Sequence, residues 1–290
     1  MNRGRGGNRR RAGRGGRQAR LLPGLVLLLL SALTLQGCAA AASPPAPPAT
    51  GGQAASAAPV WRPSPADSWQ WQLSGAIDVT VQADIFDVDF ETTTTEEIDA
   101  LKQQGRRLVC YFSAGSWEDY RGDAGQFPLA VRGEPMDGWP DEQWLDIRQQ
   151  DVLLPIVAAR MDACAAKGFD AVEPDNLDGY VNETGFPLTA QDQLAYNRAV
   201  ARLAHDRGLS VALKNDVDQI PELVEDFDFA INEECVRYDE CGLYAPFTGA
   251  GKAVLHVEYQ GGLGFCPDAR RQGFSSMLKP LDLGAARSPC

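Results

Sequence analysis

The chain has 290 residues, of which 27 are Lys or Arg, 39 are Asp or Glu and 2 are His. The excess of acidic residues argues against a nucleic-acid partner, because binding to phosphates requires a basic surface. Two histidines exclude a histidine-rich metal site, and the seven cysteines follow no zinc-binding spacing. We therefore expect neither a metal ion nor another cofactor.

The first 37 residues have the pattern of a bacterial lipoprotein signal peptide. Residues 1–20 contain eight arginines and no acidic residue, and the apolar run Leu21–Leu35 follows. A basic segment before an apolar stretch of this length is typical of an export signal, and the stretch is too short to span a bilayer comfortably. The sequence Leu-Gln-Gly-Cys ends at Cys38 and resembles a lipobox, which implies cleavage before Cys38 and its lipidation. A plain signal peptide cleaved near Ala39–Ala42 is the alternative.

Residues 38–60 are predicted to form a tether, and residues 61–290 one folded domain. The tether is rich in Ala, Pro, Ser and Gly, a composition that cannot bury an apolar core. Removing the eight signal arginines from 27 basic residues leaves 19 against 39 acidic residues, a net charge near −20. This charge would attract a cationic substrate, although it is also typical of a protein that stays soluble outside the cell. We expect a monomer that reaches the membrane only through its lipid anchor.

Eight short β-rich segments alternate with helical or loop stretches along the domain. This alternation predicts the α/β class, with a parallel (β/α)₈ barrel, the TIM barrel, as the architecture. The predicted strands span residues 69–74, 85–90, 108–113, 171–175, 211–215, 229–233, 254–259 and 275–278.

Three helices are predicted from their end signals. A Thr followed three residues later by an acid forms a capping box, and a Gly stops a helix at its carboxyl end. The predicted helices are 95–104 (Thr94 with Glu97, then Gly105), 155–167 (Pro155 near the first turn, then Gly168) and the helix opened by Thr189 with Asp192 and ended by Gly208.

Polar residues gather where the predicted strands end. Strands of a parallel barrel are nearly continuous apolar runs, and the active site lies at their carboxyl ends. Solvated loop starts are the alternative explanation for any single ending, but five endings together favour a functional rim. The residues are Asp87, Asp89, Glu173, Asp175, Asn176, Asp178, Lys214, Asn215, Asn232, Glu233, Glu258 and Tyr259.

The rim residues favour the hydrolysis of a glycosidic bond. Two carboxylates suffice for this reaction, since one protonates the leaving oxygen and the other attacks or activates water. The sequence contains no nucleophile elbow, phosphate-binding loop or dinucleotide fingerprint. Aromatic rings near the rim are suited to stacking on sugars, although each could equally pack in the core; they are Tyr111, Trp117, Tyr120, Tyr180 and Tyr259.

Four blocks of the sequence resemble glycoside hydrolase family 114. They are CYFSAGSWED at 110–119, GFDAVEPDNLDGY at 168–180, LKND at 213–216 and FDFAINEEC at 227–235. The resemblance implies a barrel enzyme that acts as an endo-α-1,4-polygalactosaminidase on a partly or fully deacetylated, and therefore cationic, galactosamine polymer. An inactive carbohydrate-binding lipoprotein on the same barrel, or a hydrolase for another amino-sugar polymer, are the alternatives.

The same resemblance implies that Asp175 and Glu233 are the catalytic pair. Glu234 would replace Glu233 if its strand ended one residue later, because side chains alternate along a strand. Glu173 is either functional or a structural acid paired with Lys214, and Glu258 is a third candidate acid. The expected substrate-binding residues are Asp87, Asp89, Tyr111, Asn176, Asp178, Lys214, Asn215, Asn232, Glu258 and Tyr259.

Six cysteines remain after Cys38, an even number that favours disulfides in an exported protein. The positions of the cysteines relative to the predicted strands favour pairing Cys235 with Cys241 and Cys266 with Cys290. Cys110 with Cys164 is the third pair, for which two buried free thiols are the alternative. Each pairing requires a Cα–Cα separation below about 7 Å.

Overall fold

The computed structural model of the protein describes residues 60–290. The predicted signal peptide 1–37, Cys38 and all but the last residue of the predicted tether 38–60 lie outside the described residues. None of the helices within 60–290 is long and apolar enough to cross a membrane.

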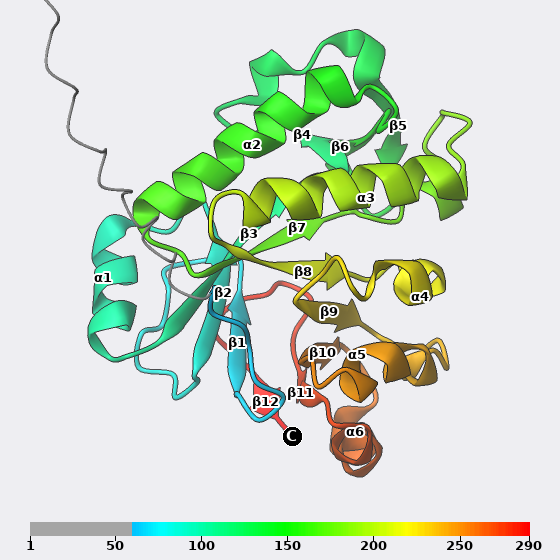
Figure 1. Cartoon of the computed structure of the whole chain (residues 1–290). Coiled ribbons are helices and arrows are strands. Elements are labelled where there is room, and N and C mark those ends of the chain that lie inside the picture. The colour runs from blue at the N-terminus through cyan, green and yellow to red at the C-terminus, as the bar shows by residue number, and fades with distance from the viewer. Residues whose placement is uncertain (1–59) are drawn as a thin grey trace, which may run out of the picture. The chain divides into compact units, whose positions relative to one another are not determined.

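The domain is built on a curled sheet of nine strands, eight of which run parallel (Figure 1). All eight predicted strands are present, with ends within two residues of those expected. In spatial order the strands are β1 (Trp69–Gln72), β2 (Ile85–Asp89), β3 (Arg107–Ser113), β7 (Ala171–Asp175), β8 (Ser210–Lys214), β9 (Phe229–Glu233), β10 (Val254–Glu258), β11 (Ser275–Leu278) and β12 (Ser288–Pro289).

The sheet does not close into the predicted barrel. The last strand, β12, pairs antiparallel with β11, and neither of them pairs with β1. Residues 279–287 instead lie between the two edges: Leu283 accepts a hydrogen bond from the backbone of Leu73, and Arg287 donates one to the carbonyl of Trp69. The prediction that the (β/α)₈ barrel closes is therefore wrong, because residues 279–287 occupy the place where β1 and β11 would pair.

Helices cover the outer face of the sheet, with α2 and α3 side by side in Figure 1. The α-helices are α1 (Thr95–Gln103), α2 (Gln150–Lys167), α3 (Ala190–His205), α4 (Ile220–Leu223), α5 (Ala245–Gly249) and α6 (Cys266–Gln272). The 3₁₀-helices are η1 (Ala124–Gln126), η2 (Leu129–Val131), η3 (Gly179–Val181), η4 (Val217–Gln219), η5 (Cys241–Tyr244) and η6 (Gly262–Phe265).

The predicted end signals shape the three long helices. Both capping boxes are formed, by Thr94 with Glu97 and by Thr189 with Asp192. Gly168 ends α2 in the left-handed conformation that glycine adopts without steric cost. Helix α2 nevertheless begins at Gln150, so Pro155 lies inside the helix rather than in its first turn.

An insertion between β3 and α2 forms a small antiparallel sheet that the sequence patterns did not predict. Its strands lie in the order β4 (Ser116–Glu118), β6 (Trp139–Leu145) and β5 (Arg132–Met136). Ser116 follows the end of β3 by three residues, so the insertion rises directly from the rim of the curled sheet.

The apolar core has two parts because side chains alternate along each strand. One part lies between the sheet and the helices and includes Phe86, Phe112 and Met161. The other fills the inside of the curl and includes Trp69 and Trp71. The curl is therefore a packed interior whose open end is the rim.

The structure contains the three predicted disulfides. The Cα–Cα separations are 6.0 Å for Cys110–Cys164, 4.8 Å for Cys235–Cys241 and 5.3 Å for Cys266–Cys290. The first ties β3 to α2, and the second closes a small loop directly after β9. The third ties the segment that follows residues 279–287 to α6.

Candidate active site

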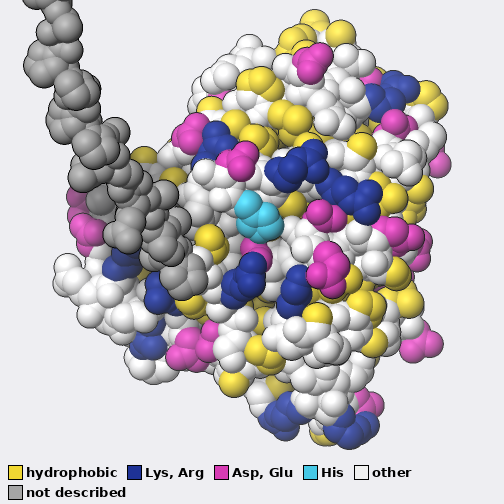
Figure 2. Space-filling view, viewed as in Figure 1, with side chains coloured by type: hydrophobic (Ala, Val, Ile, Leu, Met, Phe, Trp, Pro, Cys, Tyr) yellow, Lys and Arg dark blue, Asp and Glu magenta, His cyan; other side chains and the backbone are white. Residues whose placement is uncertain are grey.

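A cavity of about 970 Å³ opens at the carboxyl ends of the parallel strands. Eight acidic side chains line it against two basic ones, Arg121 and Lys214. The face of the domain seen in Figure 2 carries acidic and basic side chains in a mixed arrangement, whereas acidic side chains predominate in the lining of the cavity. The acidic lining residues are Asp89, Asp137, Glu142, Asp175, Asp178, Glu183, Glu233 and Asp282.

Lys214 lies at the floor of the cavity and joins three carboxylates. Its Nζ is 3.0 Å from Glu173 Oε1, 3.0 Å from Asp175 Oδ1 and 3.2 Å from Glu233 Oε2. It also lies 4.6 Å from the centre of the Trp71 ring, within range of a cation–π contact. Burial opposes the ammonium charge, but the carboxylates of Asp175, Glu173 and Glu233 raise the pKa of Lys214 well above its usual range.

Asp175 ends β7 and receives three hydrogen bonds. Lys214 and the backbone N–H of Asn176, at 2.8 Å, donate to Oδ1, and the Tyr111 hydroxyl donates to Oδ2 at 2.9 Å. Asn176 has a φ of 63°, a left-handed conformation that asparagine tolerates better than most residues. This turn aims the Asn176 N–H back at the carboxylate and so fixes its orientation.

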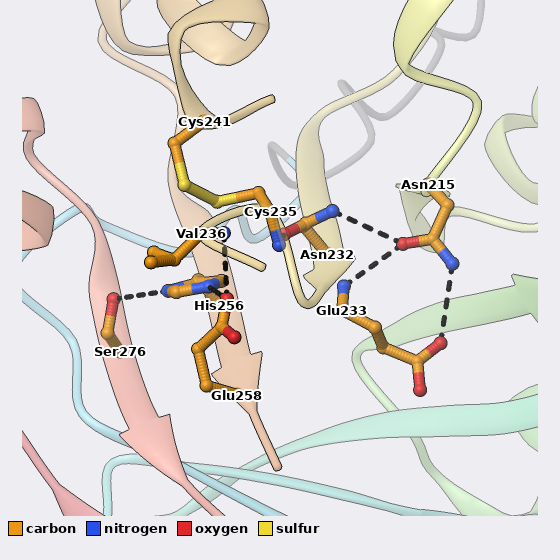
Figure 3. The surroundings of a disulfide bond; sticks show 9 residues. All are labelled: Asn215, Asn232, Glu233, Cys235, Val236, Cys241, His256, Glu258 and Ser276. Carbon is orange, nitrogen blue, oxygen red and sulfur yellow. Dashed lines mark hydrogen bonds and ion pairs between the residues drawn. A yellow bond between two sulfur atoms is a disulfide. The ribbon is translucent and has the colours of Figure 1, made fainter. Parts of the chain in front are cut away.

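Glu233 ends β9 and is held by the neighbouring strands (Figure 3). Asn215 accepts a hydrogen bond from the Glu233 backbone N–H at 3.0 Å and donates its amide to Glu233 Oε2 at 3.3 Å. The Tyr259 hydroxyl donates to Oε1. Because Lys214 Nζ contacts both carboxylates, Asp175 and Glu233 face one another across a single ammonium group.

A carboxyl pair lies beneath this arrangement. Asp87 on β2 is fully buried within hydrogen-bonding reach of Glu173, which is also fully buried. Among residues 60–290, no group donates a hydrogen bond to either Asp87 oxygen or to Glu173 Oε2. We call Asp87, Glu173, Asp175, Lys214 and Glu233 the lysine cluster.

A second group of buried charges supports the wall of the cavity. Arg121 contacts Asp89 at 2.6 Å and Glu118 at 2.9 Å. Arg160 of α2 contacts Glu118 at 3.2 Å and Asp123 at 2.8 Å. We call Asp89, Glu118, Arg121, Asp123 and Arg160 the arginine cluster; it fastens the insertion to β2 and α2.

Nine of the twelve predicted catalytic and binding residues line the cavity, and three do not. The three are Asp87, Asn232 and Glu258, which have at most 5% of their side chains exposed. Glu258 accepts hydrogen bonds from the Val236 N–H and from His256, and Asn232 bridges the Cys235 N–H and Asn215 (Figure 3). Buried behind the rim, these three side chains do not reach a substrate in this conformation. The nine are Asp89, Tyr111, Asp175, Asn176, Asp178, Lys214, Asn215, Glu233 and Tyr259.

The alternative acid Glu234 does not line the cavity. It has a φ of 60° and pairs with Arg237 at 2.8 Å. Glu173 is the acid that was expected to be either functional or paired with Lys214, and it does contact Lys214. Its position below the cavity floor fits the structural alternative.

Several lining residues carried no signal that the sequence patterns could detect. Trp71 lies on the first predicted strand, and Asp137, Trp139, Glu142 and Trp144 belong to the unpredicted insertion. Burial raises the pKa of Glu142 to about 7, although the Ser116 hydroxyl, which donates to it at 2.6 Å, opposes this rise. Glu142 lies in none of the family blocks and comes beside one, opposite Glu118, only once β6 pairs with β4.

Among residues 60–290, one group of side chains has the spacing of a metal site, namely Cys235, Cys241 and His256. Both sulfur atoms belong to the same disulfide, so they offer no thiolate to a metal. His256 also uses both ring nitrogens in hydrogen bonds, with Ser276 and Glu258 (Figure 3).

Comparisons with known proteins give the family of the chain and the fold it shares. The family model described as glycoside-hydrolase family GH114 matches residues 50–290. The crystal structure of *Aspergillus fumigatus* Ega3 in complex with galactosamine is 35% identical, with a TM-score of 0.75, and the match covers 79% of this chain and 97% of that one. The glycoside hydrolase domain of PelA from *Pseudomonas aeruginosa* shares the fold at 14% identity and a TM-score of 0.61, over 76% and 97% of the two chains. None of the curated protein sequences compared with the chain matches it.

Proposed function

The chain belongs to glycoside hydrolase family GH114, and on this premise we propose that it cleaves α-1,4 linkages inside a galactosamine polymer. The observation that carries the proposal is the facing pair Asp175 and Glu233, which share Lys214 at the floor of an acidic cavity. A pair of carboxylates is the machinery that most glycoside hydrolases use. The related Ega3 was crystallised with galactosamine, the building block of the proposed substrate.

The separation of the two carboxylates favours retention of anomeric configuration. Lys214 Nζ lies 3.0 Å from Asp175 Oδ1 and 3.2 Å from Glu233 Oε2, so these oxygens are closer than the roughly 6.5–9.5 Å of inverting enzymes. A shorter separation is the spacing at which one carboxylate attacks the sugar directly and no water is placed between them. We therefore expect a covalent glycosyl-enzyme intermediate.

We assign the nucleophile to Asp175 and the acid–base role to Glu233. Asp175 is the less exposed side chain, at 17% against 28%, and a backbone N–H helps to orient it. It would attack the anomeric carbon while Glu233 gives its proton to the departing glycosidic oxygen. Glu233 would then take a proton from water, which displaces Asp175 and releases the sugar with its original configuration.

Azide is a small nucleophile that can react in variants lacking Asp175 or Glu233, and the anomeric configuration of its product distinguishes the two roles. With Asp175→Gly, azide should attack from the vacated side and yield a β-glycosyl azide. With Glu233→Ala, azide should attack the covalent intermediate and yield an α-glycosyl azide. Nuclear magnetic resonance distinguishes the two products, and the opposite pattern would reverse the assignment.

The charge of the cavity fits a substrate with free amino groups. Eight carboxyl side chains surround two basic ones, so a polymer that carries ammonium groups is attracted and a polyanion is repelled. Burial raises the pKa of Asp178 to about 6, although the backbone N–H of Asp178 opposes this rise, and no side chain within the described part of the chain donates a hydrogen bond to its carboxylate. An amino sugar would bring the missing donor.

The rim of the cavity fits a long chain rather than a single chain end. Three lining aromatic side chains are well exposed: Tyr120 at 61%, Trp139 at 51% and Tyr238 at 57%. Tyr120 and Trp139 belong to the insertion after β3, and Tyr238 follows β9, so sugar-stacking surfaces flank the catalytic pair on more than one side. This arrangement supports internal cleavage.

One assay tests the function. Purified protein should release oligosaccharides of several lengths from deacetylated galactosaminogalactan, with products identified by mass spectrometry, and acetylation of the polymer should slow the reaction. Binding without release of product would favour the inactive carbohydrate-binding alternative. Release only from a different amino-sugar polymer would favour the alternative hydrolase.

We also propose that the protein is exported and held at the membrane by lipids on Cys38. The basic and apolar segments of the first 37 residues support export, and three disulfides fit an oxidising compartment. Labelling of the host cells with a radioactive fatty acid should mark the wild-type protein and leave Cys38→Ala unmarked. Equal labelling of both would contradict the lipid anchor.

A further inference from the structure

The floor of the lysine cluster contains more carboxyl groups than its single cation can balance. Lys214 already contacts Glu173, Asp175 and Glu233, and Asp87 is a fourth acid behind Glu173. Asp87 and Glu173 are both fully buried, so water does not compensate their charges. Two ionised carboxylates in contact at such a place would be strongly unfavourable.

Unpaired atoms mark where a proton belongs. Three buried oxygens of this pair receive no hydrogen bond from any group that the structure describes: both carboxyl oxygens of Asp87 and Oε2 of Glu173. A carboxylate can only accept, so two carboxylates cannot satisfy one another, whereas one added proton makes one of them a donor to the other. The fourth oxygen of the pair, Glu173 Oε1, already accepts from Lys214 at 3.0 Å.

The neighbouring elements decide which carboxyl keeps the proton. Glu173 and Asp175 of β7 act on Asp87 as negative charges, and Lys214 of β8 acts as the nearest cation. Tyr111 of β3 donates its hydroxyl to Asp175, and β1 contributes the uncharged Trp71. Since the ammonium touches Glu173 and not Asp87, the charge is best held on Glu173 and the proton on Asp87. Burial, followed by the charge of Glu173, raises the pKa of Asp87 well above its usual range.

We propose that Asp87 and Glu173 hold one proton between them, and that the loss of this proton ends activity at alkaline pH by drawing Lys214 away from Asp175 and Glu233. The shared proton does not depend on the proposed function, whereas the loss of activity at alkaline pH rests on it. When hydroxide removes the proton, the pair carries two negative charges, and within the described part of the chain Lys214 is the only cation that touches it. Asp87 is thus a positioning residue that acts through Glu173 and Lys214 and does not meet the substrate.

Asp87→Asn tests the proposal because an asparagine keeps the shape and donates an amide hydrogen that cannot be lost. At neutral pH, the infrared difference spectrum of wild type minus Asp87→Asn should contain the carbonyl stretch of a protonated carboxylic acid. Glu173→Gln should lose the same band, since its amide donates to Asp87 and lets Asp87 ionise. Absence of the band from the wild type, or its persistence in both variants, would overturn the proposal. This measurement uses no substrate, so it stands even if the proposed function fails.

The pH profile tests the second half. Asp87→Asn should keep turnover at neutral pH within about tenfold of the wild type, a change of about 1.4 kcal/mol in the barrier. The alkaline limit of its activity should move upward by about one pH unit or more, because no proton is left to lose. An alkaline limit that stays in place would overturn this half.

Asp216→Asn is the matched control. Asp216 is another buried carboxyl, whose pKa burial raises to about 8, but its hydrogen-bond donor is Asn197 at 2.8 Å and it does not contact Lys214. Its substitution should leave the alkaline limit of activity unmoved. If Asp216→Asn moved the alkaline limit of activity as far as Asp87→Asn does, the limit would depend on the overall negative charge of the domain and not on the Asp87–Glu173 pair, and the proposal would be wrong.

Discussion

The lysine cluster and the arginine cluster are both buried, yet their charges are arranged in opposite ways. In the arginine cluster two guanidinium groups meet Asp89, Glu118 and Asp123, and more distantly the partly exposed Glu91 at 3.7 Å; Glu118 receives hydrogen bonds on both oxygens. In the lysine cluster one ammonium meets three carboxylates directly, with Asp87 as a fourth behind them. Three oxygens of the lysine cluster lack a donor, and none of the arginine cluster does within residues 60–290.

The difference separates structural charge from functional charge. A buried carboxylate that already has all of its hydrogen-bond donors stabilises one arrangement of the chain. Its oxygens have little remaining capacity to accept a hydrogen bond from a ligand. A cluster short of cations keeps affinity for protons and for cationic groups, which is what acid–base chemistry on an amino sugar needs. The arginine cluster holds the insertion in place so that the lysine cluster can remain unbalanced beside it.

Asp175→Asn and Glu233→Gln test the lysine cluster most severely. Each should reduce turnover by about 10²–10⁴-fold, because the substitution removes the nucleophile or the proton donor. Each should leave the fold intact, since both side chains lie at the rim and not in the apolar core. Turnover on the polymer and the thermal unfolding midpoint are the two measurements.

Glu234→Gln and Glu258→Gln are the matched controls for that experiment. Glu234 pairs with Arg237 outside the cavity, and Glu258 holds the Val236 N–H behind the rim. Both variants should keep turnover within about tenfold of the wild type, with a stability loss of about 1–3 kcal/mol for the buried Glu258. Loss of turnover in either control while Asp175→Asn stays active would show that the catalytic pair is wrongly chosen.

Arg160→Met tests the arginine cluster. It should lower the stability of the protein, whereas Asp175→Asn and Glu233→Gln should lower its turnover. It leaves Glu118 with one cation instead of two and removes both hydrogen bonds from Arg160 to Asp123. Breaking a buried ion pair in this way costs about 3–5 kcal/mol in the free energy of unfolding. Urea unfolding provides the measurement. Because Arg160 does not line the cavity, a large loss of turnover in the folded variant would contradict the division between the clusters.

Asp216→Asn examines a buried carboxyl that has only a neutral donor. The pKa of Asp216 is raised from 3.8 to about 8, first of all by burial, so the folded state binds a proton that the unfolded state has released. Stability of the wild type should therefore fall as pH rises from about 4 to about 8. The advantage of Asp216→Asn over the wild type should grow by about 1–3 kcal/mol between pH 5 and pH 8. Parallel stability curves for the two proteins would contradict the raised pKa.

Arg271→Ala should have the smallest effect. Arg271 and Asp268 form an ion pair on α6 with 70% and 66% of their side chains exposed. Water and salt screen such pairs, so the free energy of unfolding should change by less than about 1 kcal/mol. If Arg271→Ala lowered the free energy of unfolding as much as Arg160→Met, burial would not explain why the ion pairs of the arginine cluster are strong.

The strands and helix ends could be predicted because their signals are local. Apolar runs, capping boxes and glycine stops depend on neighbouring residues, and the polar endings of the strands indicated the rim that bears Asp175 and Glu233. The insertion of β4, β5 and β6 could not be predicted, since its strands do not alternate regularly between buried and exposed residues. Whether an acid at a strand end faces the cavity, as Asp89 does, or the interior, as Asp87 does, depends on depth along the strand, which no sequence pattern records.

The open edge of the sheet has a consequence for the order of folding. Trp69 donates its ring N–H to the carbonyl of Ser275, 206 residues later, and Arg287 donates to the carbonyl of Trp69 across 218 residues. Contacts between such distant parts of a chain form slowly, because a long loop must close before they stabilise anything. During synthesis from the amino end, β1 therefore waits with one edge unpaired until nearly the whole domain has been made.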